Sequence, residues 1–236
     1  MRNGARIGVV IPAQNEQNAI ARVIGDIPRW VDEIIVADNG STDATADVAR
    51  RAGAFVVHEA EPGYGAACLK GIATLGRVDV IAFTDGDYAD YPEDLAQLID
   101  PIVGEGVDLV IGSRAIGERQ DGALTPQQIF GNWLATRLIG LIWGMKFTDL
   151  GPFRAIRSKA LQSLAMADRN YGWTVEMQIK AAKAGLACRE VPARYRRRIG
   201  ISKVSGTLKG TLMAGYKILW MIGSQALGDL VSRRRN

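Results

Sequence analysis

Short apolar stretches alternate with stretches of helical periodicity along the first half of the chain. The apolar stretches cover residues 7–11, 33–37, 54–58, 79–84 and 108–112. Near-continuous apolar runs of this length are typical of strands that are buried on both faces. Between them, apolar residues recur at helical spacing, as they do from Ile20 to Ile27 and from Leu95 to Ile102. The alternation predicts an α/β fold with a mostly parallel central sheet and helices on both faces.

Polar clusters follow four of these predicted strands. They are Pro12–Glu16, Asp38–Asp43, Asp85–Asp87 and Gly112–Arg114. The carboxyl ends of parallel strands share one edge of a sheet, and ligands of such sheets bind beyond that edge. A single cluster would be an ordinary helix cap, but four clusters at one edge predict a binding site.

The stretch VIAFTDGDYADYPEDL ends an apolar run in five acidic residues. In an extended segment Asp85 and Asp87 point to the same side, with Gly86 between them. Hard oxygen ligands suit Mg²⁺ or Mn²⁺, and such a metal takes few protein ligands when substrate phosphates supply the others. We therefore expect this pair to hold a metal and a nucleotide diphosphate. Asp90, Glu93 and Asp94 are instead expected to open the next helix, where negative charge is stabilising.

The order of the motifs resembles that of a known enzyme family. The motifs are VVIPAQNE, VADNGSTDAT, GYGAACLKG, TDGDYAD, GSR, TDLGPFRAI and RRRIGISKVSG. Together they resemble the family 2 glycosyltransferases of the GT-A (Rossmann-like) fold, and most closely the polyprenyl-phosphate (dolichol-phosphate) sugar synthases. The resemblance spans residues 6–205. It implies a GT-A glycosyltransferase domain over 1–205, followed over 206–236 by a C-terminal amphipathic, interfacial helix and a basic tail.

The resemblance also implies roles for individual residues. Those expected to bind the nucleotide sugar are Pro12, Ala13, Asn15, Glu16, Asp38, Asn39, Gly63, Tyr64, Gly65, Lys70, Asp85, Gly86 and Asp87. Asp87 would be the principal metal ligand, and Asp85 would lie near the metal or the ribose. Asn39 departs from the family pattern, which commonly has a second acid at this position.

The acceptor is expected to be a polyprenyl phosphate. It is already an anion, so the protein needs cations to hold it against the sugar rather than a strong base. Residues expected to bind phosphate are Arg114, Arg196, Arg198, Ser202 and Lys203. The run Leu124–Gln128 argues against this acceptor, because lipid-phosphate synthases tend to have basic residues there.

A hydroxyl acceptor would instead require a base. Asp149 and Glu176 are the two candidates, and Glu176 follows Tyr171 and Trp173, which could stack on a sugar ring. The alternative is that Asp149 caps a turn and that Glu176 forms an ion pair with Lys180 one helical turn later.

Charge and composition indicate which binding partners and which cellular compartment to expect. The net charge is +4, and basic residues concentrate between residues 189 and 203 and in the final SRRRN. Such clusters suit phosphates or acidic lipids, whereas the aromatic-interleaved basic motifs of nucleic-acid-binding modules are absent from the sequence. The two cysteines have no metal-type spacing and indicate a reducing compartment. We expect a cytoplasmic protein that binds no nucleic acid.

Two apolar stretches raise the question of a membrane. Residues 129–147 and 207–230 contain charged residues, and neither has the roughly 20 apolar residues that a spanning helix needs. Either could lie on the cytoplasmic face of a membrane as a peripheral contact. A contact between copies of the chain, forming a homo-oligomer, would explain the same apolar surface.

The sequence therefore predicts an inverting, metal-dependent glycosyltransferase that uses a nucleotide-diphosphate sugar. UDP-glucose is the favoured donor and GDP-mannose the second, with a polyprenyl phosphate or a soluble hydroxyl compound as acceptor. From other classes, a nucleotidyltransferase shares the fold, and a non-catalytic nucleotide-sugar-binding or membrane scaffold protein is a further reading. The glycines around Gly63 have the wrong spacing for a dinucleotide fingerprint, which argues against a dehydrogenase.

Overall fold

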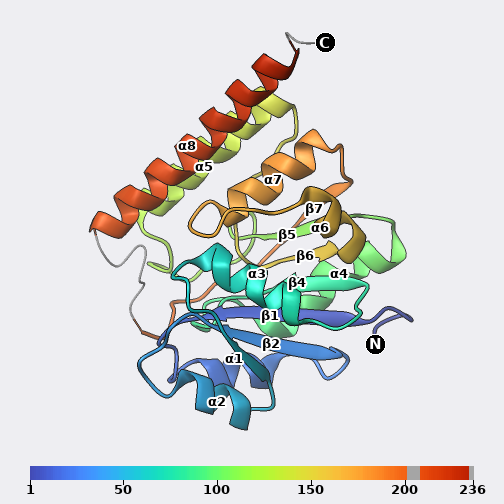
Figure 1. Cartoon of the computed structure of the whole chain (residues 1–236), viewed down its shortest axis with the longest axis vertical. Helices are drawn as coiled ribbons and strands as arrows, with labels where there is room; N and C mark the ends of the chain where they lie inside the picture. Colours follow the sequence, from blue (N-terminus) through green and yellow to red (C-terminus); the bar gives the residue numbers. More distant parts are fainter. Residues whose placement is uncertain (201–207, 234–236) are drawn as a thin grey trace.

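A seven-stranded sheet forms the centre of the molecule in the computed structural model, which describes residues 1–200 and 208–233 (Figure 1). The strands are β1 (Ile7–Ala13), β2 (Glu33–Asp38), β3 (Phe55–His58), β4 (Val80–Phe83), β5 (Leu109–Ser113), β6 (Arg154–Arg157) and β7 (Cys188–Pro192). Their order is β3-β2-β1-β4-β6-β5-β7. Only β6 runs antiparallel to its neighbours, β4 and β5. The predicted mostly parallel sheet is confirmed.

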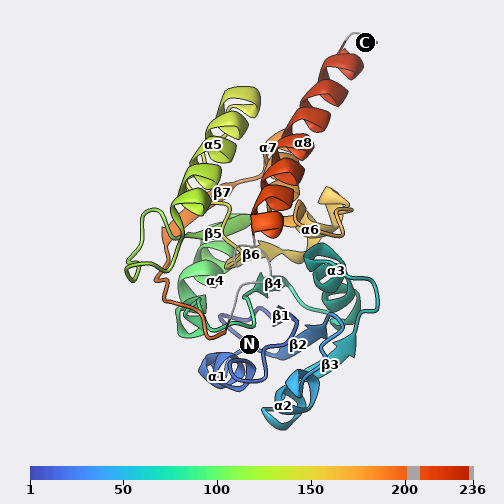
Figure 2. The same ribbon diagram turned by 90° about the vertical axis from the view of Figure 1, so that its left-hand side faces the viewer.

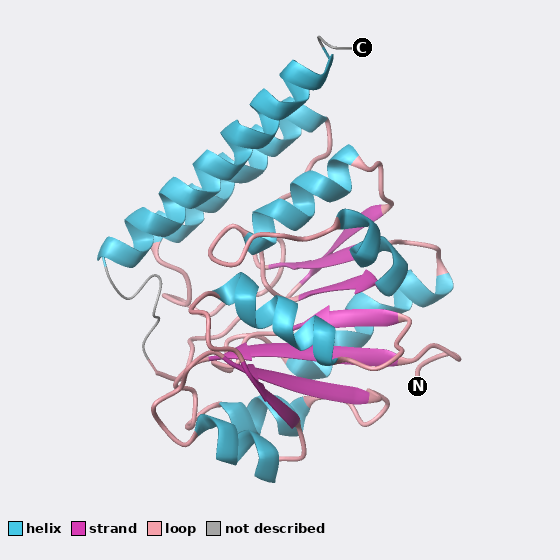
Figure 3. Cartoon of the chain, viewed as in Figure 1, coloured by secondary structure: helices cyan, strands magenta, loops and turns pink. Residues whose placement is uncertain are grey.

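Helices cover both faces of the sheet, as predicted (Figures 2 and 3). They are α1 (Ile20–Asp26), α2 (Thr45–Arg51), α3 (Tyr64–Thr74), α4 (Leu95–Gly104), α5 (Pro126–Trp143), α6 (Ser158–Leu164), α7 (Trp173–Lys183) and α8 (Leu208–Arg233), with a short 3₁₀ turn η1 at Pro92–Asp94. The apolar sides of α1, α2 and α4 share one core cluster. Those of α3 and α5 to α8 share another on the opposite face.

The two strands that the sequence pattern did not predict are β6 and β7. Their sequences, RAIR and CREVP, contain charged residues and lack a long apolar run. β7 lies at the edge of the sheet, so half-exposed polar side chains are tolerated there. β6 is central, and its Arg154 is fully buried. Backbone carbonyls accept hydrogen bonds from the Arg154 guanidinium and so make this burial possible.

Helix α5 has clear local signals at both ends. Thr125 accepts a hydrogen bond from the Gln128 amide, and the Gln128 side chain accepts one from the Thr125 amide, which is a capping box. Pro126 occupies the first turn, and the helix ends at Gly144, whose φ of 77° is a left-handed conformation that glycine adopts readily. α8 packs alongside α5 and α7. Within the described ranges, no helix has both the length and the apolar character required to cross a membrane.

Candidate active site

A cavity of about 440 Å³ opens at the carboxyl edge of the sheet. Its lining comes from the ends of β1, β2, β4 and β5, from the loop that begins α3, and from α5, α7 and α8. Of the residues predicted from sequence, those that line it are Pro12, Ala13, Glu16, Asn39, Gly63, Tyr64, Asp85, Gly86, Asp87, Arg114 and Arg198. The four polar clusters predicted to share one edge therefore do meet.

Three carboxylates lie close together at this edge of the sheet. Asp85 and Asp87 line the cavity, and Asp90 is buried beside them, where it accepts hydrogen bonds from the Thr84 hydroxyl and the Asp85 amide. Burial and the neighbouring carboxylates Asp87 and Asp90 raise the pKa of Asp85 to about 8. Burial and Asp87 raise that of Asp90 to about 6. With no cation bound, the crowded carboxylates at the predicted metal position thus retain a proton near neutral pH, whereas a divalent cation there would favour their ionised forms.

The expected role of Asp90 needs correction. It does not open helix α4, because its side chain stabilises the turn that carries Asp85. Glu93 and Asp94 lie in the turn before α4, as predicted, but both form ion pairs with Arg194, and neither caps the helix through its side chain. These acids looked alike in the sequence. In the fold, Asp90 lies beside the cavity carboxylates, whereas Glu93 and Asp94 pair with Arg194.

Arg198 supplies a positive charge at the carboxylate cluster. Its guanidinium forms an ion pair with Asp87 at 2.8 Å. Arg196, two residues earlier, has another environment. It donates to the carbonyls of Tyr88 and Asp90 and stacks over the rings of Tyr88 and Tyr91. Arg198 therefore reaches the cavity, while Arg196 is held in the wall behind it.

The glycine loop before α3 is packed against another loop. A Cβ at Gly63 would lie 2.1 Å from the Arg169 carbonyl oxygen, and Gly63 also has a φ of 152°. A Cβ at Gly65 would lie 2.1 Å from the carbonyl oxygen of Asp168. Asn39 fixes the same loop, because its amide accepts from the Gly63 N–H and donates to the carbonyls of Glu59 and Glu61. A carboxylate could not make the two donations, which gives the Asn39 departure a structural reason.

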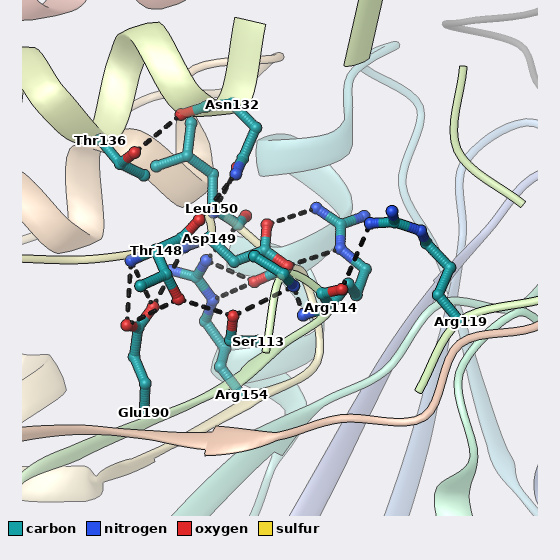
Figure 4. Close-up of polar contacts among 12 residues, drawn as sticks. Ser113, Arg114, Arg119, Asn132, Thr136, Thr148, Asp149, Leu150, Arg154 and Glu190 are labelled. Atoms are coloured by element: carbon teal, nitrogen blue, oxygen red, sulfur yellow. Dashed lines mark hydrogen bonds and ion pairs between the residues drawn. The ribbon is translucent and has the colours of Figure 1, made fainter. Parts of the chain in front are cut away.

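Arg114, which lines the cavity, forms a buried ion pair with Asp149. Asp149 accepts from the backbone amide, Nε and Nη2 of Arg114 at 2.7–2.8 Å (Figure 4). Burial alone would lower the pKa of Arg114, but the adjacent Asp149 carboxylate more than offsets this, so the pKa lies above its ordinary value. Both side chains are thus already partnered, although they are 35 residues apart in the chain.

Arg154 and Glu190 support this pair, and neither was predicted from the sequence as a site residue, although Arg154 lies within the TDLGPFRAI motif. Arg154 is fully buried and donates to the carbonyls of Leu150 and Gly151 (Figure 4). Burial lowers its pKa to about 10. Glu190 accepts from the amides of Thr148 and Asp149. The segment that presents Asp149 is therefore held from both sides by side chains of β6 and β7.

Comparisons with known proteins give the family. Residues 8–164 match the model of the family described as glycosyl transferase family 2. The chain belongs to this family. It is 35% identical over 215 residues to an uncharacterized glycosyltransferase of Mycobacterium tuberculosis, covering 89% of this chain and 95% of that protein.

Two further relatives have more specific names. A dolichyl-phosphate hexose transferase of Haloferax volcanii is 32% identical over 204 residues, covering 84% of this chain and 86% of the relative. An undecaprenyl-phosphate mannosyltransferase of Micrococcus luteus is 30% identical over 221 residues, covering 87% and 90%. Both names describe sugar transfer to a polyprenyl phosphate.

A solved structure is also similar. Glucosyl-3-phosphoglycerate synthase from Mycobacterium tuberculosis, crystallised with Mn²⁺, UDP-glucose and phosphoglyceric acid, superposes with a TM-score of 0.77 at 27% identity. The match covers 94% of this chain and 80% of that one. The predicted GT-A-like fold and glycosyltransferase class are therefore confirmed.

Several residues predicted to act in this glycosyltransferase do not line the cavity. The Asn15 side chain accepts a hydrogen bond from the Thr42 amide. Asp38 is buried, and its carboxylate oxygen lies 3.4 Å from Nδ1 of His58. Gly65 and Lys70 lie on α3 outside the lining. Ser202 and Lys203, and the expected boundary at residues 205 and 206, fall outside the described residues.

The structure turns Glu176 away from the cavity. Its carboxylate accepts from the amides of Ala167 and Asp168 and forms an ion pair with Lys180 at 2.8 Å. This is the ion pair that was the alternative reading of the sequence, and it leaves the catalytic-base hypothesis for Glu176 without geometric support. Its effect is to hold the 165–172 loop that packs on Gly63.

Lining residues missed by sequence reasoning come mainly from the second half of the chain. They include Tyr195, Gln128, Leu150, Thr174, Ala214 and Ile218. Burial raises the pKa of Tyr195 to about 12, so its hydroxyl stays protonated beside Arg198. Ala214 and Ile218 belong to α8. They belong to no recognisable sequence motif, and their small or aliphatic side chains carry no chemical signal. Only the packing of α8 brings them to the cavity.

The carboxylates at the cavity fit a divalent cation. Ionisation of Asp85, Asp87 and the buried Asp90 together would leave negative charge that Arg198 offsets only in part, and this repulsion raises the pKa values of Asp85 and Asp90. Among residues 1–200 and 208–233, no group of three or more histidine, cysteine, aspartate or glutamate side chains is arranged to hold a metal ion. Asp85 and Asp87 would therefore hold Mg²⁺ or Mn²⁺ together with diphosphate oxygens, which Mg²⁺ sites commonly use.

Proposed function

We propose that this glycosyltransferase moves a hexose, with glucose favoured, from a nucleotide-diphosphate sugar to a polyprenyl phosphate at a membrane surface, inverting the anomeric carbon. UDP-glucose is the favoured donor and Mg²⁺ or Mn²⁺ the required metal. The observation that carries the proposal is the cavity itself. Within one space of about 440 Å³ it brings together the carboxylates of Asp85 and Asp87 and the guanidinium groups of Arg114 and Arg198.

The acidic and the basic residues of the cavity suit different parts of the two substrates. Asp85 and Asp87, with Glu16 and Tyr64 nearby, would hold the donor, because carboxylates accept hydrogen bonds from ribose and sugar hydroxyls. The Tyr64 hydroxyl donates to Asp85 at 3.0 Å and so orients that carboxylate. A bound divalent cation would neutralise the charge that develops on the leaving diphosphate.

The chemistry on the acceptor side needs orientation more than proton transfer. An acceptor phosphate oxygen would attack the anomeric carbon from the face opposite the diphosphate as the bond to the diphosphate breaks. The phosphate oxygen is already ionised, so no side chain has to remove a proton. Arg198, and the face of Arg114 that Asp149 leaves exposed to the cavity, would hold the acceptor phosphate against the repulsion of the acids.

A soluble hydroxyl acceptor is the second candidate, because the similar glucosyl-3-phosphoglycerate synthase was crystallised with phosphoglyceric acid. That chemistry needs a base, for which Asp149 is the remaining sequence-predicted residue. Asp149 accepts three hydrogen bonds from Arg114, so both of its oxygens are already occupied, and it is not among the residues that line the cavity. This contact favours the phosphate acceptor. The mannosyltransferase relative keeps GDP-mannose as the alternative donor.

The test is a panel of UDP- and GDP-sugars with Mg²⁺ or Mn²⁺, assayed for nucleoside diphosphate release with and without a polyprenyl phosphate. We expect the lipid phosphate to accelerate release from one donor and to yield a sugar-phosphate lipid. Phosphoglyceric acid and free sugars are tested in parallel as soluble acceptors in place of the lipid. If no donor responds to the lipid phosphate while one responds to a soluble acceptor, the proposed acceptor is wrong.

A further inference from the structure

The exposed side of helix α8 is apolar. Between residues 213 and 231, every exposed residue is aliphatic, aromatic, methionine or glycine. The large ones include Met213, Tyr216, Trp220, Leu227 and Leu230, which are 50–64% exposed. A helix on the surface of a globular protein ordinarily turns its polar face outward, so this distribution is inverted.

Helix α5 continues the apolar surface. It lies alongside α8, and both helices run in the same direction along one edge of the molecule (Figures 1 and 2). Phe130 and Trp133 are 60% and 51% exposed, and their ring centroids lie 5.9 Å apart. Leu141, near the other end of α5, is 81% exposed. We call the exposed apolar side chains of the two helices the α5/α8 face. Exposed apolar surface of this extent marks an interaction site.

The charges of the two helices favour an anionic partner. Their sequences contain four basic residues, Arg137, Lys209, Lys217 and Arg233, and one acidic residue, Asp229. Asp229 accepts a hydrogen bond from the Trp143 indole and pairs with Lys183, so its charge is compensated within the protein. Lys217 lies 5.2 Å from the centroid of the Trp220 ring and pairs with Asp168 at 2.8 Å, so its charge is also balanced within the protein. Arg137 is exposed on α5, and neither helix has an exposed acidic residue among its described side chains. An exposed basic residue beside exposed tryptophan and tyrosine, with no exposed acid, is compatible with a helix pair that lies in the interface of an anionic bilayer.

The α5/α8 face is continuous with the cavity. Gln128 of α5 and Ala214 and Ile218 of α8 line the same space as Asp85 and Asp87. Ile129 and Met213, the chain neighbours of two of these residues, are exposed on the apolar side. An amphiphile whose phosphate enters the cavity would therefore find apolar surface directly outside it.

We propose that the α5/α8 face rests on an anionic lipid bilayer and so places the mouth of the cavity at the level of lipid headgroups. The role of this contact rests on the proposed function, because a polyprenyl phosphate would then reach Arg114 and Arg198 with its tail still in the lipid. Binding of the α5/α8 face to a bilayer needs no substrate and can be tested separately.

Co-sedimentation of the full chain with lipid vesicles tests the surface directly. We expect binding to phosphatidylcholine vesicles that contain phosphatidylglycerol, and weaker binding to phosphatidylcholine alone or at high salt. The double variant Trp133→Ser/Trp220→Ser should lower the partition constant by about tenfold or more, because binding scales with buried apolar area. Both residues are half-exposed, so the change removes little of the packing inside the protein.

Phe55→Ser is the matched control. Phe55 is 63% exposed and lies on β3, the edge strand at the end of the sheet away from β7. We expect this variant to bind vesicles like the unaltered protein. Failure of the unaltered protein to bind, or an equal loss in Phe55→Ser, overturns the proposal. A dimer that becomes monomeric in the double variant, without vesicle binding, assigns the face to a second copy of the chain and also overturns it.

Two transfer assays separate this inference from the proposed function. The double variant should retain transfer to a short-chain, water-soluble polyprenyl phosphate and lose transfer to a long-chain one held in vesicles. If vesicle binding behaves as expected but neither lipid phosphate accepts sugar, the proposed acceptor fails and the surface stands. If both acceptors are used equally by both proteins, the surface has no part in acceptor delivery.

Discussion

The guanidinium of Arg198 lies 2.8 Å from the carboxylate of Asp87, the residue expected to be the principal metal ligand. A divalent cation bound to Asp87 would compete with this arginine for the same oxygens. The pairing also keeps Arg198 within the cavity, where a diphosphate would enter. One side chain can thus balance the acids when no substrate is bound and contact phosphate when it is.

Replacing Arg198 should therefore separate metal binding from donor binding. We expect Arg198→Gln to bind Mn²⁺ alone several-fold more tightly, because a competing cation is gone, and to bind the nucleotide sugar with Mn²⁺ more weakly. Titration calorimetry measures both affinities. Arg197→Gln is the matched control, since Arg197 is exposed and donates to the Asp121 carbonyl away from the acids. Unchanged Mn²⁺ affinity in Arg198→Gln would contradict the competition.

Asp87 should be essential for metal-dependent donor binding. Asp87→Ala removes the principal expected metal ligand, so we expect Mn²⁺-dependent binding of the favoured donor to fall below detection and transfer to be lost. Asp94→Ala is the comparison within the same acidic stretch, because Asp94 pairs with Arg194 rather than lining the cavity. Sugar transfer that survives unimpaired in Asp87→Ala would show the metal assignment to be wrong.

The carboxylate cluster should make the metal-free protein less stable as pH rises. Burial and Asp87 raise the pKa of Asp85 to about 8, well above the ordinary value of an aspartate. The folded state therefore holds a proton that the unfolded state releases, and this stabilisation is present at low pH and lost as pH rises toward 8. Urea unfolding in EDTA at a series of pH values measures the slope. Asp85→Asn should flatten it, and an identical slope in that variant would contradict the assignment.

Gly63 should not tolerate a side chain. In Gly63→Ala the new Cβ would meet the Arg169 carbonyl oxygen, and the backbone is strained for any residue but glycine. We expect a loss of about 2 kcal/mol or more in the free energy of unfolding, with weaker donor binding, because the loop must move. Gly25→Ala in α1 is the control, since no atom lies within 4 Å of its Cβ position. That change should be neutral or slightly stabilising.

Much of the fold could be predicted because its signals are local. Five of the seven strands were predicted from apolar runs of adjacent residues, and the parallel order placed their polar ends at one edge. The two strands that were missed have charged residues, and these are accommodated only by an edge position or by partners elsewhere, such as the carbonyls around Arg154.

The site was predictable to the extent that its residues follow strands in sequence. Asp85, Asp87 and Glu16 line the cavity because each follows directly from a buried strand whose direction fixes where the chain emerges. The same kind of evidence led us to expect Asp90 to open a helix, and it left Glu176 between a catalytic base and an ion pair with Lys180. Whether a carboxylate faces the cavity, a turn or a lysine depends on packing against segments distant in the chain.

The sequence by itself determined the family, the edge at which the site lies and the two acids at its centre, because motifs and apolar periodicity are properties of neighbouring residues. Only the tertiary structure decided that Arg114 is bound by Asp149, that Arg198 rather than Arg196 reaches the acids, and that α8 closes over the cavity with its apolar side outward. These relationships join residues far apart in the chain, and the packing of whole elements sets them.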